Sequence, residues 1–177
     1  MTVRNIVLGG GCFWCIESVF NNIIGVHSAV SGYAGGQDDH PTYEKICTGN
    51  SGHAEVVKVS YDSSVISLEE LLKVFFTIHD PTTLNRQGND IGSQYRSVIF
   101  YNSEEERQVA EQMITDLNRQ AIFQNKIVTQ LEELKTFFPA EDYHQEYFKK
   151  NPGNPYCQYS IPPKKKKILE KFPDYLK

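Results

Sequence analysis

The sequence has no long hydrophobic run, no excess of basic residues and few cysteines, and each absence excludes a class of protein. No apolar segment among the 177 residues reaches the roughly 20 residues that a membrane-spanning helix needs, so we expect no membrane association. The formal net charge of −4 gives no sign of a nucleic-acid partner. Four cysteines are too few for a disulfide-dense scaffold. We therefore expect a reducing compartment, the cytoplasm, in which the cysteines serve for reactivity.

Signs of processing and of division into domains are also missing. No basic segment followed by an apolar core stands near the start, so we expect no secretory signal. The sequence shows no internal repeat and no dividing linker, and its length suits one sizeable core. We therefore expect a single domain over 1–177, with a core of about 4–150 and a C-terminal tail of 151–177.

The most informative stretch is Gly9-Gly10-Gly11-Cys12-Phe13-Trp14-Cys15-Ile16-Glu17, which holds three consecutive glycines, two cysteines and the only tryptophan. A short β-like run at 5–8 precedes it, and apolar residues at helical spacing follow it to residue 23. The pattern predicts a strand, a glycine turn and a helix with Cys12 in its first turn. A helix N-terminus favours a thiolate and can lower a cysteine pKa from about 8.5 to roughly 3.5–7.5.

Two other interpretations of this stretch are weaker. Its two cysteines could form half of a zinc site, but Cys47 and Cys157 are isolated in the sequence, so we expect no metal. The pair could also be buried and unreactive. However, Phe13 and Trp14 leave a helix start in different directions, so they cannot both enter one core face. One of them should line a surface pocket.

The rest of the chain mixes strands with helices. We expect strands at 26–33, 54–61, 96–101 and 127–134, the last at a sheet edge, and helices at 42–47, 68–79, 104–120 and 141–150. Ser67 with Glu70 and Ser103 with Glu106 fit capping boxes that start two of these helices. Segment 82–95 is too polar for a core element, and loops of that length are often functional. This order predicts an α+β domain with a mixed sheet.

The C-terminal region predicts little regular structure. Two prolines and a glycine interrupt residues 151–155, which therefore cannot be regular. From Tyr156 we expect an irregular tail and then a weak amphipathic helix. The four lysines Lys164–Lys167 are expected to form a solvated charge run; a nuclear or acidic-partner signal has no support in the sequence.

Five polar or aromatic residues fall on loops or at strand starts rather than at core positions: Tyr43, His53, Glu55, Asp90 and Tyr95. Glu55 opens a strongly apolar strand. It is either an exposed carboxylate at a strand end or a general acid whose pKa an apolar pocket raises. Asp90 can equally make a turn, and the tyrosines can be ordinary packing residues.

Seven sequence blocks, running in order from residue 4 to about 160, resemble the A-type peptide methionine sulfoxide reductases. They are Gly11-Cys12-Phe13-Trp14-Cys15-Ile16-Glu17 and the segments 32–36, 41–43, 52–57, 79–83, 86–97 and 140–145. The resemblance implies a ferredoxin-like βαβ core wrapped by long loops. It also implies reduction of methionine S-sulfoxide, free or in oxidised proteins, with no bound cofactor and with thioredoxin as the external reductant.

The resemblance further implies a role for the residue at each matching position. Cys12, as a thiolate, attacks the sulfoxide sulfur, and Glu55 donates the proton. Tyr43 and Tyr95 match the hydroxyls that bind the sulfoxide oxygen, and Asp90 helps to orient the polar side of the site. The pocket for the S-methyl group matches Phe13 and Trp14.

The thiol that resolves the Cys12 sulfenic acid is implied less directly. Family members commonly use a C-terminal cysteine, so we expect Cys157, on a tail able to reach the site, to form the disulfide. The commonest family pattern has glycine after the tryptophan, where this chain has Cys15, which is therefore a second candidate. Cys47 is a third candidate, and direct external reduction is a fourth.

Two rival functions remain open at this point. A general thiol–disulfide oxidoreductase could use Cys12-x-x-Cys15, but it leaves the blocks at 52–55 and 88–95 unexplained. A non-catalytic module that binds methionine or peptides would need no thiolate at Cys12. For the reductase we expect a monomer.

Overall fold

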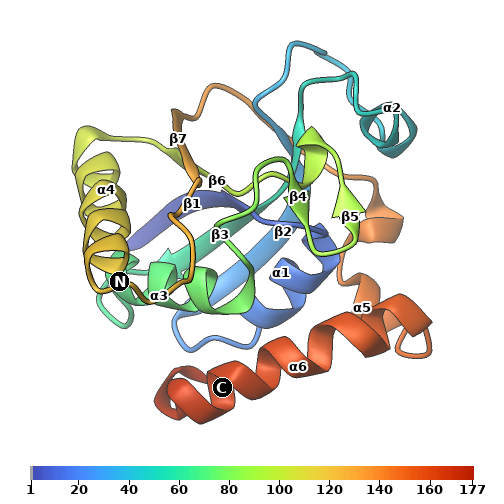
Figure 1. Ribbon diagram of the computed structural model, residues 1–177. Helices are drawn as coiled ribbons and strands as arrows, with labels where there is room; N and C mark the ends of the chain where they lie inside the picture. The colour runs from blue at the N-terminus through green and yellow to red at the C-terminus, as the bar shows by residue number, and fades with distance from the viewer. Residues whose placement is uncertain (1) are drawn as a thin grey trace.

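A six-stranded sheet in the order β7-β6-β1-β3-β2-β8 forms the centre of the computed structural model, which describes residues 2–177 (Figure 1). Its strands are β1 (Val3–Gly9), β2 (Val26–Ala34), β3 (Ala54–Asp62), β6 (Val98–Tyr101), β7 (Gln130–Glu133) and β8 (Phe137–Pro139). β6 and β7 pair in parallel, and the other neighbours pair antiparallel. A separate hairpin joins β4 (Arg86–Gln87) to β5 (Asp90–Ile91). The expected mixed sheet and α plus β content are confirmed.

Helices cover one face of this sheet. The helices are α1 (Phe13–Phe20), α2 (Tyr43–Cys47), α3 (Leu68–Ile78), α4 (Glu104–Arg119), α5 (Tyr147–Lys150) and α6 (Pro155–Lys171). α1, α3 and one side of α4 pack with the sheet in the main hydrophobic core. α6 crosses below α1 and α3 and contacts both, as Figure 1 shows.

The alternation of side chains along the strands divides the core between the two faces. In β1, Ile6 and Leu8 face the helices, whereas Val7 joins a smaller cluster on the other face. That second cluster is closed by Leu134 and Phe137, from the segment that leads into β8. The helix-covered face therefore holds the larger core, and α1 is fixed firmly beneath the end of β1.

Local signals in the sequence located the helices well where capping was clear. Ser67 accepts a hydrogen bond from the Glu70 N–H at 3.1 Å, and the Glu70 carboxylate accepts from the Ser67 N–H at 3.2 Å, which completes the expected capping box. At the start of α4, Ser103 accepts from the Glu106 N–H, but the Glu106 carboxylate binds the Asn102 N–H instead. The expected edge strand at 127–134 is confirmed as the shorter β7.

The expected irregular segment from Tyr156 is wrong, because the 17-residue helix α6 already begins at Pro155, whereas the amphipathic helix expected after that segment is confirmed as the second half of α6. Asn154 caps it by accepting the Cys157 N–H at 3.1 Å, and Pro155 occupies its first turn, where a missing N–H costs nothing. Cys157, Ile161 and Ile168 are buried along one side of the helix. Packing of that side holds α6 together despite the two prolines inside it.

The helix expected at 141–150 is interrupted in the structure. A short 3₁₀ turn at Asp142–His144 and α5 are separated by Glu146, whose backbone is left-handed at φ 51°. Gln145 binds the backbone N–H and C=O of Ser31, and the Glu146 N–H donates to the Glu17 carboxylate. Tertiary hydrogen bonds to β2 and α1 therefore override the local helical pattern.

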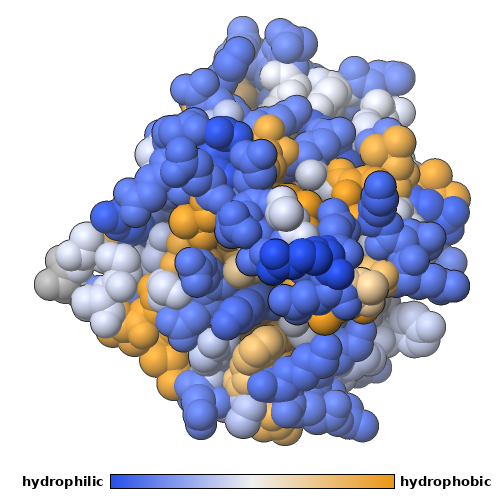
Figure 2. Space-filling model, turned by 60° about the vertical axis from the view of Figure 1, so that its left-hand side comes forward, coloured by the Kyte–Doolittle hydropathy of each residue, from blue (hydrophilic) through white to orange (hydrophobic). Residues whose placement is uncertain are grey.

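The surface is mainly polar. On the face in Figure 2, hydrophilic residues surround separate apolar patches. No helix in the part of the chain that the structure describes is long and apolar enough to cross a membrane.

Candidate active site

A tight glycine turn carries the chain from β1 into α1. The Gly11 N–H donates to the Tyr95 carbonyl at 3.2 Å, and its φ of 88° suits glycine. A Cβ on Gly10 would lie 2.7 Å from the His79 ring, and one on Gly11 would lie 2.7 Å from the Gln87 side chain. These close approaches leave no room for side chains, so the turn holds the next residue, Cys12, in a fixed place.

Cys12 occupies the N-cap position of α1 and is partly exposed, whereas Cys15 is almost fully buried one turn later. Burial is the main cause of a raised Cys12 pKa, followed by its interaction with the Cys15 thiol and the negative charge of Glu55. The same interaction between the thiols is the main cause of a lowered Cys15 pKa. The hydrogen bond between the two thiols therefore favours a single thiolate within the pair.

The sequence-based expectation of a lowered Cys12 pKa is wrong for this state. A hydrogen bond from the Trp14 backbone N–H does lower the Cys12 pKa, as a helix N-terminus should. Burial, the Cys15 thiol and the charge of Glu55 raise it by more. The thiolate of Cys12 is consequently favoured when Glu55 is neutral.

Glu55, the second residue of β3, is 1% exposed and accepts the Phe13 N–H at 3.2 Å. Burial raises its pKa to about 8, and the charges of Asp90 and Cys15 act in the same direction. The carboxyl group is therefore mainly protonated at neutral pH and can donate a proton. The exposed strand-end alternative is ruled out by this burial.

Two tyrosines face Glu55 from separate segments. Tyr43 begins α2, and Tyr95 ends a 3₁₀ turn at Ser93–Tyr95. Burial raises both pKa values, and the charges of Glu55 and Cys12 add to the effect on each. Both side chains therefore remain phenols that can donate hydrogen bonds. The structure thus brings together four of the residues singled out in the sequence: Cys12, Glu55, Tyr43 and Tyr95.

Asp90 lies on the β4–β5 hairpin, at the edge of this group. Its carboxylate accepts the Tyr156 hydroxyl of α6 at 2.6 Å. Tyr156 also stands edge-on to Trp14, with ring centroids 6.4 Å apart. Asp90 thus connects the hairpin to α6 next to the thiol pair. This contact could not be predicted from the sequence, because the two residues are 66 positions apart.

Phe13 and Trp14 diverge as expected. Phe13 is fully buried in the core, whereas Trp14 is partly exposed and stacks on Tyr147 with centroids 3.8 Å apart. The Trp14 indole N–H donates to His144 Nδ1 at 3.0 Å. An apolar wall therefore lies beside Cys12, and Trp14 is its partly exposed member.

His144 and Tyr147 were not singled out as site residues in the sequence. His144 is 1% exposed, and burial lowers its pKa, so the ring is neutral. Because Nδ1 accepts the Trp14 N–H, the proton is on Nε2, which has no protein partner among the residues that the structure describes. The only sequence signal for this residue was its place in the 140–145 block.

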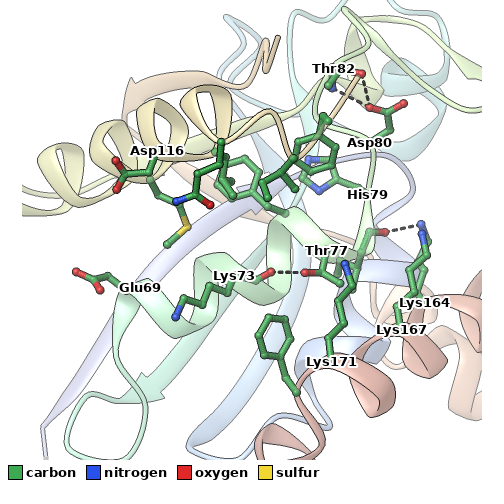
Figure 3. Close-up of a pocket in the computed structure, with 18 of the residues that line it drawn as sticks. Glu69, Lys73, Thr77, His79, Asp80, Thr82, Asp116, Lys164, Lys167 and Lys171 are labelled. Carbon is green, nitrogen blue, oxygen red and sulfur yellow. Dashed lines mark hydrogen bonds between the residues drawn. The ribbon is translucent and has the colours of Figure 1, made fainter. Parts of the chain in front are cut away.

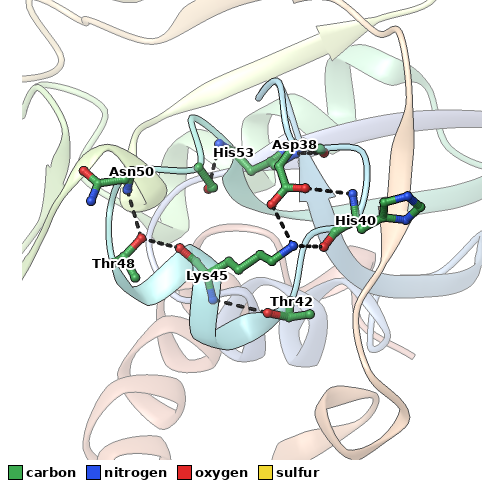
Figure 4. A network of polar contacts seen from close by, with 8 residues as sticks. Asp38, His40, Thr42, Lys45, Thr48, Asn50 and His53 are labelled. Atoms are coloured by element: carbon green, nitrogen blue, oxygen red, sulfur yellow. Dashed lines mark hydrogen bonds and ion pairs between the residues drawn. The ribbon is translucent and has the colours of Figure 1, made fainter.

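Glu141 and His53 hold the segment that carries Tyr43. The Glu141 carboxylate accepts the Tyr33 hydroxyl at 2.8 Å and the Tyr43 N–H at 3.0 Å. His53 accepts the Gly36 N–H at 3.0 Å and bonds the Asp38 carbonyl at 2.7 Å (Figure 4). Both ring nitrogens of His53 are occupied by backbone groups, so His53 supports the loop rather than facing Cys12.

The loop before α2 is also held by contacts of Lys45, which Figure 4 shows. The Lys45 ammonium lies 3.2 Å from the Asp38 carboxylate and donates to the His40 carbonyl at 2.9 Å. Thr42 accepts the Lys45 N–H at the start of α2. These contacts position Tyr43 from both sides of its own backbone.

All four cysteines are free thiols. Cys157 is completely buried in a small cluster with Cys15 and Ile161, against which Cys12 and Trp14 pack. Burial, followed by the charge of Cys15, raises the Cys157 pKa to about 11. Cys157 is therefore held in a helix beside the pair and does not lie on a mobile tail.

Cys47 is exposed at the end of α2, although partial desolvation of its thiol is the largest cause of its raised pKa.

Among residues 2–177, no three His, Cys, Asp or Glu side chains are grouped so that they could hold a metal ion.

A cavity of about 1070 Å³, shown in Figure 3, is not the place of this chemistry. It lies between α3, α4 and α6, and none of Cys12, Glu55, Tyr43 and Tyr95 lines it. It reaches the site only from behind, through His79 and Gln87, whose side chains press on the glycine turn.

Comparisons with known proteins agree with this geometry. Residues 4–175 match the family model described as peptide methionine sulfoxide reductase. The peptide methionine sulfoxide reductase MsrA of Trichodesmium erythraeum is 56% identical over 169 residues, which are 96% of each chain.

Solved structures give the same result. Reduced Mxr1 from Saccharomyces cerevisiae is 39% identical and has a TM-score of 0.77 over 90% of each chain. The structure of Mxr1 in complex with Trx2 is 32% identical, with a TM-score of 0.54 over 82% of this chain and 84% of that one. The chain belongs to the peptide methionine sulfoxide reductase family.

Proposed function

We propose that this chain reduces methionine S-sulfoxide, free or in oxidised proteins, with Cys12 as nucleophile and Glu55 as general acid. One observation carries the proposal: Glu55, a buried and mainly protonated carboxyl group, accepts the N–H of Phe13, the residue next to Cys12, and its charge acts on Tyr43 and Tyr95. A sulfoxide sulfur is a poor electrophile until its oxygen is protonated. A neutral acid beside a thiol meets that need.

The reductive step transfers the sulfoxide oxygen to Cys12. Tyr43 and Tyr95 donate hydrogen bonds to the sulfoxide oxygen, and Glu55 protonates it as the Cys12 thiolate attacks the sulfur. The hydroxyl group so formed passes from the methionine sulfur to the Cys12 sulfur, and the bond between the two sulfurs breaks with its electron pair left on methionine; the proton from Glu55 is the only one consumed. Methionine leaves, and Cys12 is oxidised to a sulfenic acid, so two electrons have passed from the thiol to the sulfoxide.

The apolar wall sets the orientation of the substrate. Trp14, the partly exposed member of the apolar wall, offers a surface that suits the S-methyl group, and the fully buried Phe13 supports that wall from within the core. Asp90, held by the Tyr156 hydroxyl, orients the polar side. The sulfoxide oxygen then lies on the polar side of the site and the methyl group on the apolar side. In this orientation only one epimer presents its sulfur atom to Cys12 with the lone pair pointing away.

An intramolecular disulfide then resolves the sulfenic acid. Cys15 is supported by its lowered pKa and its position one helical turn from Cys12. Cys157 is supported by its place in the same cluster, although its pKa of about 11 leaves little thiolate at neutral pH. We propose that Cys15 forms the first disulfide with release of water, and that Cys157 can exchange into it afterwards. Cys47, exposed on α2, is the least favoured resolver.

Thioredoxin is proposed as the reductant. The solved complex of Mxr1 with Trx2 supports this partner. Cys12 is the more exposed sulfur of the pair, so a reductant thiolate would attack Cys12 and expel Cys15.

The Cys12–Cys15 interaction also favours a second candidate, a general thiol–disulfide oxidoreductase. The two are separated by offering the reduced protein the S-sulfoxide, the R-sulfoxide or a small disulfide such as cystine, and counting product in a single turnover. The proposal expects about one methionine per chain from the S-sulfoxide, little from the R-sulfoxide, and none with Cys12→Ser. Rapid cystine reduction without methionine formation would favour the second candidate.

We also propose a ferredoxin-like architecture for this chain. The order β6-β1-β3-β2, with α1 and α3 on one face, supports a ferredoxin-like core. Four free thiols support function in a reducing, cytoplasmic compartment, and we propose that the chain acts as a monomer.

A further inference from the structure

Lys164 departs from the solvated lysine run expected at 164–167. Cys157, Ile161 and Ile168 are the buried residues of α6, and Lys164 lies at the same helical spacing, three residues after Ile161. Lys166 and Lys167 are exposed, but Lys164 is half-buried. An ammonium group therefore occupies a position that α6 otherwise fills with apolar side chains.

One contact fixes this ammonium group. Lys164 Nζ donates to the Ile78 carbonyl at 2.7 Å, at the last residue of α3 (Figure 3). A cation is favoured at a helix C-terminus because the last carbonyls are unpaired. In Figure 3 Lys164 and Lys167 lie close together beside the cavity, yet only Lys164 makes this bond.

Lys164 stands one turn along α6 from the buried thiol cluster. Ile161 packs with Cys15 and Cys157, and α6 contacts both α1 and α3 there. Burial is the main cause of a lowered Lys164 pKa, and the groups whose negative charge opposes that lowering are Cys15 and Cys12 from α1 and Asp90 from the hairpin.

The remaining neighbours of Lys164 are neutral or positive. On its own helix Lys167 opposes its charge. After α3 the facing His79 ring is neutral, since burial lowers its pKa to about 4. Of the two thiols, Cys15 is the one whose pKa Lys164 lowers, so its thiolate is the charge that Lys164 can stabilise.

We propose that Lys164 is a positioning residue for the thiol pair, which holds the negative charge of Cys15 during disulfide formation and disulfide reduction. The inference rests on the proposed function, and specifically on resolution by Cys15. In the forward step the Cys15 thiolate attacks the Cys12 sulfenic sulfur, the sulfur–oxygen bond breaks, and the hydroxide leaves as water after protonation. In the reverse step a reductant thiolate bonds to Cys12, and the electron pair of the broken disulfide leaves on Cys15.

The positive charge of Lys164 would speed both disulfide formation and disulfide reduction. A thiol with a lower pKa is present as the attacking thiolate to a larger extent at neutral pH, and it also leaves faster. Lys164 adds to the lowering of the Cys15 pKa, after the larger contribution of the Cys12 thiol.

A purely structural role is the main competing explanation, because the bond to Ile78 also joins α6 to α3. Lys164→Gln separates the two roles, since its amide keeps a donor but has no charge. Lys164→Met, which removes charge and donor but keeps most of the apolar stem, is the second variant in case one fails to fold. Lys167→Gln is the matched control, one turn along the same helix and without the bond.

The assay follows disulfide formation after one turnover. Reduced protein is mixed with an equal amount of methionine S-sulfoxide between pH 6 and 10, quenched with acid, and mapped by mass spectrometry. Loss of the Lys164 charge should raise the Cys15 pKa, so that less thiolate is present near neutral pH. We therefore expect Lys164→Gln to form the Cys12–Cys15 disulfide several-fold more slowly at pH 7, to recover the wild-type rate near pH 10, and to release methionine at the wild-type rate.

Each result decides one question. An unchanged pH profile in Lys164→Gln and Lys164→Met, or an equal shift in Lys167→Gln, would overturn the role of Lys164. Slower disulfide formation by the same factor at every pH would also overturn it, because it would indicate a structural effect. Absence of methionine from the wild-type protein would instead overturn the proposed function.

Discussion

Replacing Glu55 by glutamine tests the chemistry and the energetics of the site together. The amide of the Glu55→Gln variant would keep an oxygen that can accept the Phe13 N–H, but it has no acidic proton. General acids contribute about 10²–10⁴-fold to a reaction rate. We expect Glu55→Gln to slow methionine formation at pH 7 by about that factor, while the protein still folds.

The pH dependence has a definite sign. With a pKa of about 8, roughly nine-tenths of Glu55 is protonated at pH 7 and about a tenth at pH 9. The reductive step needs a protonated Glu55 together with a Cys12 thiolate, and the Cys12 pKa is raised above its ordinary value. The wild-type rate should therefore rise with pH up to about 8 and level off above it, whereas the low rate of Glu55→Gln should continue to rise as the Cys12 thiolate forms.

Stability should change in the opposite direction to activity. The pKa of Glu55 rises from 4.5 to about 8 on folding, so the native state retains a proton that the unfolded state releases in that window. Stability attributable to this group is present below pH 4.5 and is lost as the pH rises toward 8. At about 1.4 kcal/mol per unit, the loss at pH 7 reaches about 3 kcal/mol. Glu55→Gln should be more stable at pH 7 by up to that amount.

Two measurements check this reasoning. Rapid quench of a single turnover gives the rate of methionine formation, and urea unfolding at pH 5 and pH 8 gives the free energy of unfolding. Glu106→Gln, another buried carboxylate replacement at the start of α4, is the control and should leave the pH profile unchanged. A wild-type rate in Glu55→Gln at pH 7 would refute the acid role, and equal stability changes with pH in both proteins would refute the raised pKa.

Three further changes have expected outcomes. Gly11→Ala should lower the free energy of unfolding by more than about 1 kcal/mol in urea, because φ is 88° and the new methyl group would lie 2.7 Å from Gln87; an unchanged stability would contradict the strained turn. Trp14→Phe loses the hydrogen bond to His144 but keeps an aromatic ring, so we expect a several-fold higher KM for methionine sulfoxide in steady-state assays, and an unchanged KM would argue against an orienting role. Cys15→Ser should leave the first methionine burst intact but delay disulfide formation by at least about tenfold, as mapped by mass spectrometry; an undelayed disulfide would assign resolution to another thiol.

Periodicity and capping were enough to predict most of the fold. The alternation along β1 and β3 and the capping residue Ser67 are local signals, and local signals act on the backbone within a few residues. The first half of the C-terminal helix escaped prediction because Pro162 and Pro163 disfavour it locally. Its buried side, which only the folded sheet and helices supply, compensates for them.

The same distinction applies to the site. Cys12 and Glu55 could be singled out because a glycine turn and a strand start placed unusual residues at predictable points. The roles of Tyr156 and Lys164 could not, because each depends on a contact across more than 60 positions, to Asp90 and to Ile78. The net direction of the Cys12 pKa also escaped prediction, since burial is a tertiary property that outweighs the helix N-terminus.

The most direct test of the account maps the cysteines after one turnover. Reduced protein is mixed with excess methionine S-sulfoxide without reductant, methionine is counted per chain, and modified cysteines are located by peptide mapping. The account expects about one to two methionines per chain and a disulfide that contains Cys12, first to Cys15. Methionine formed while Cys12 stays unmodified, or no methionine at all, would contradict it.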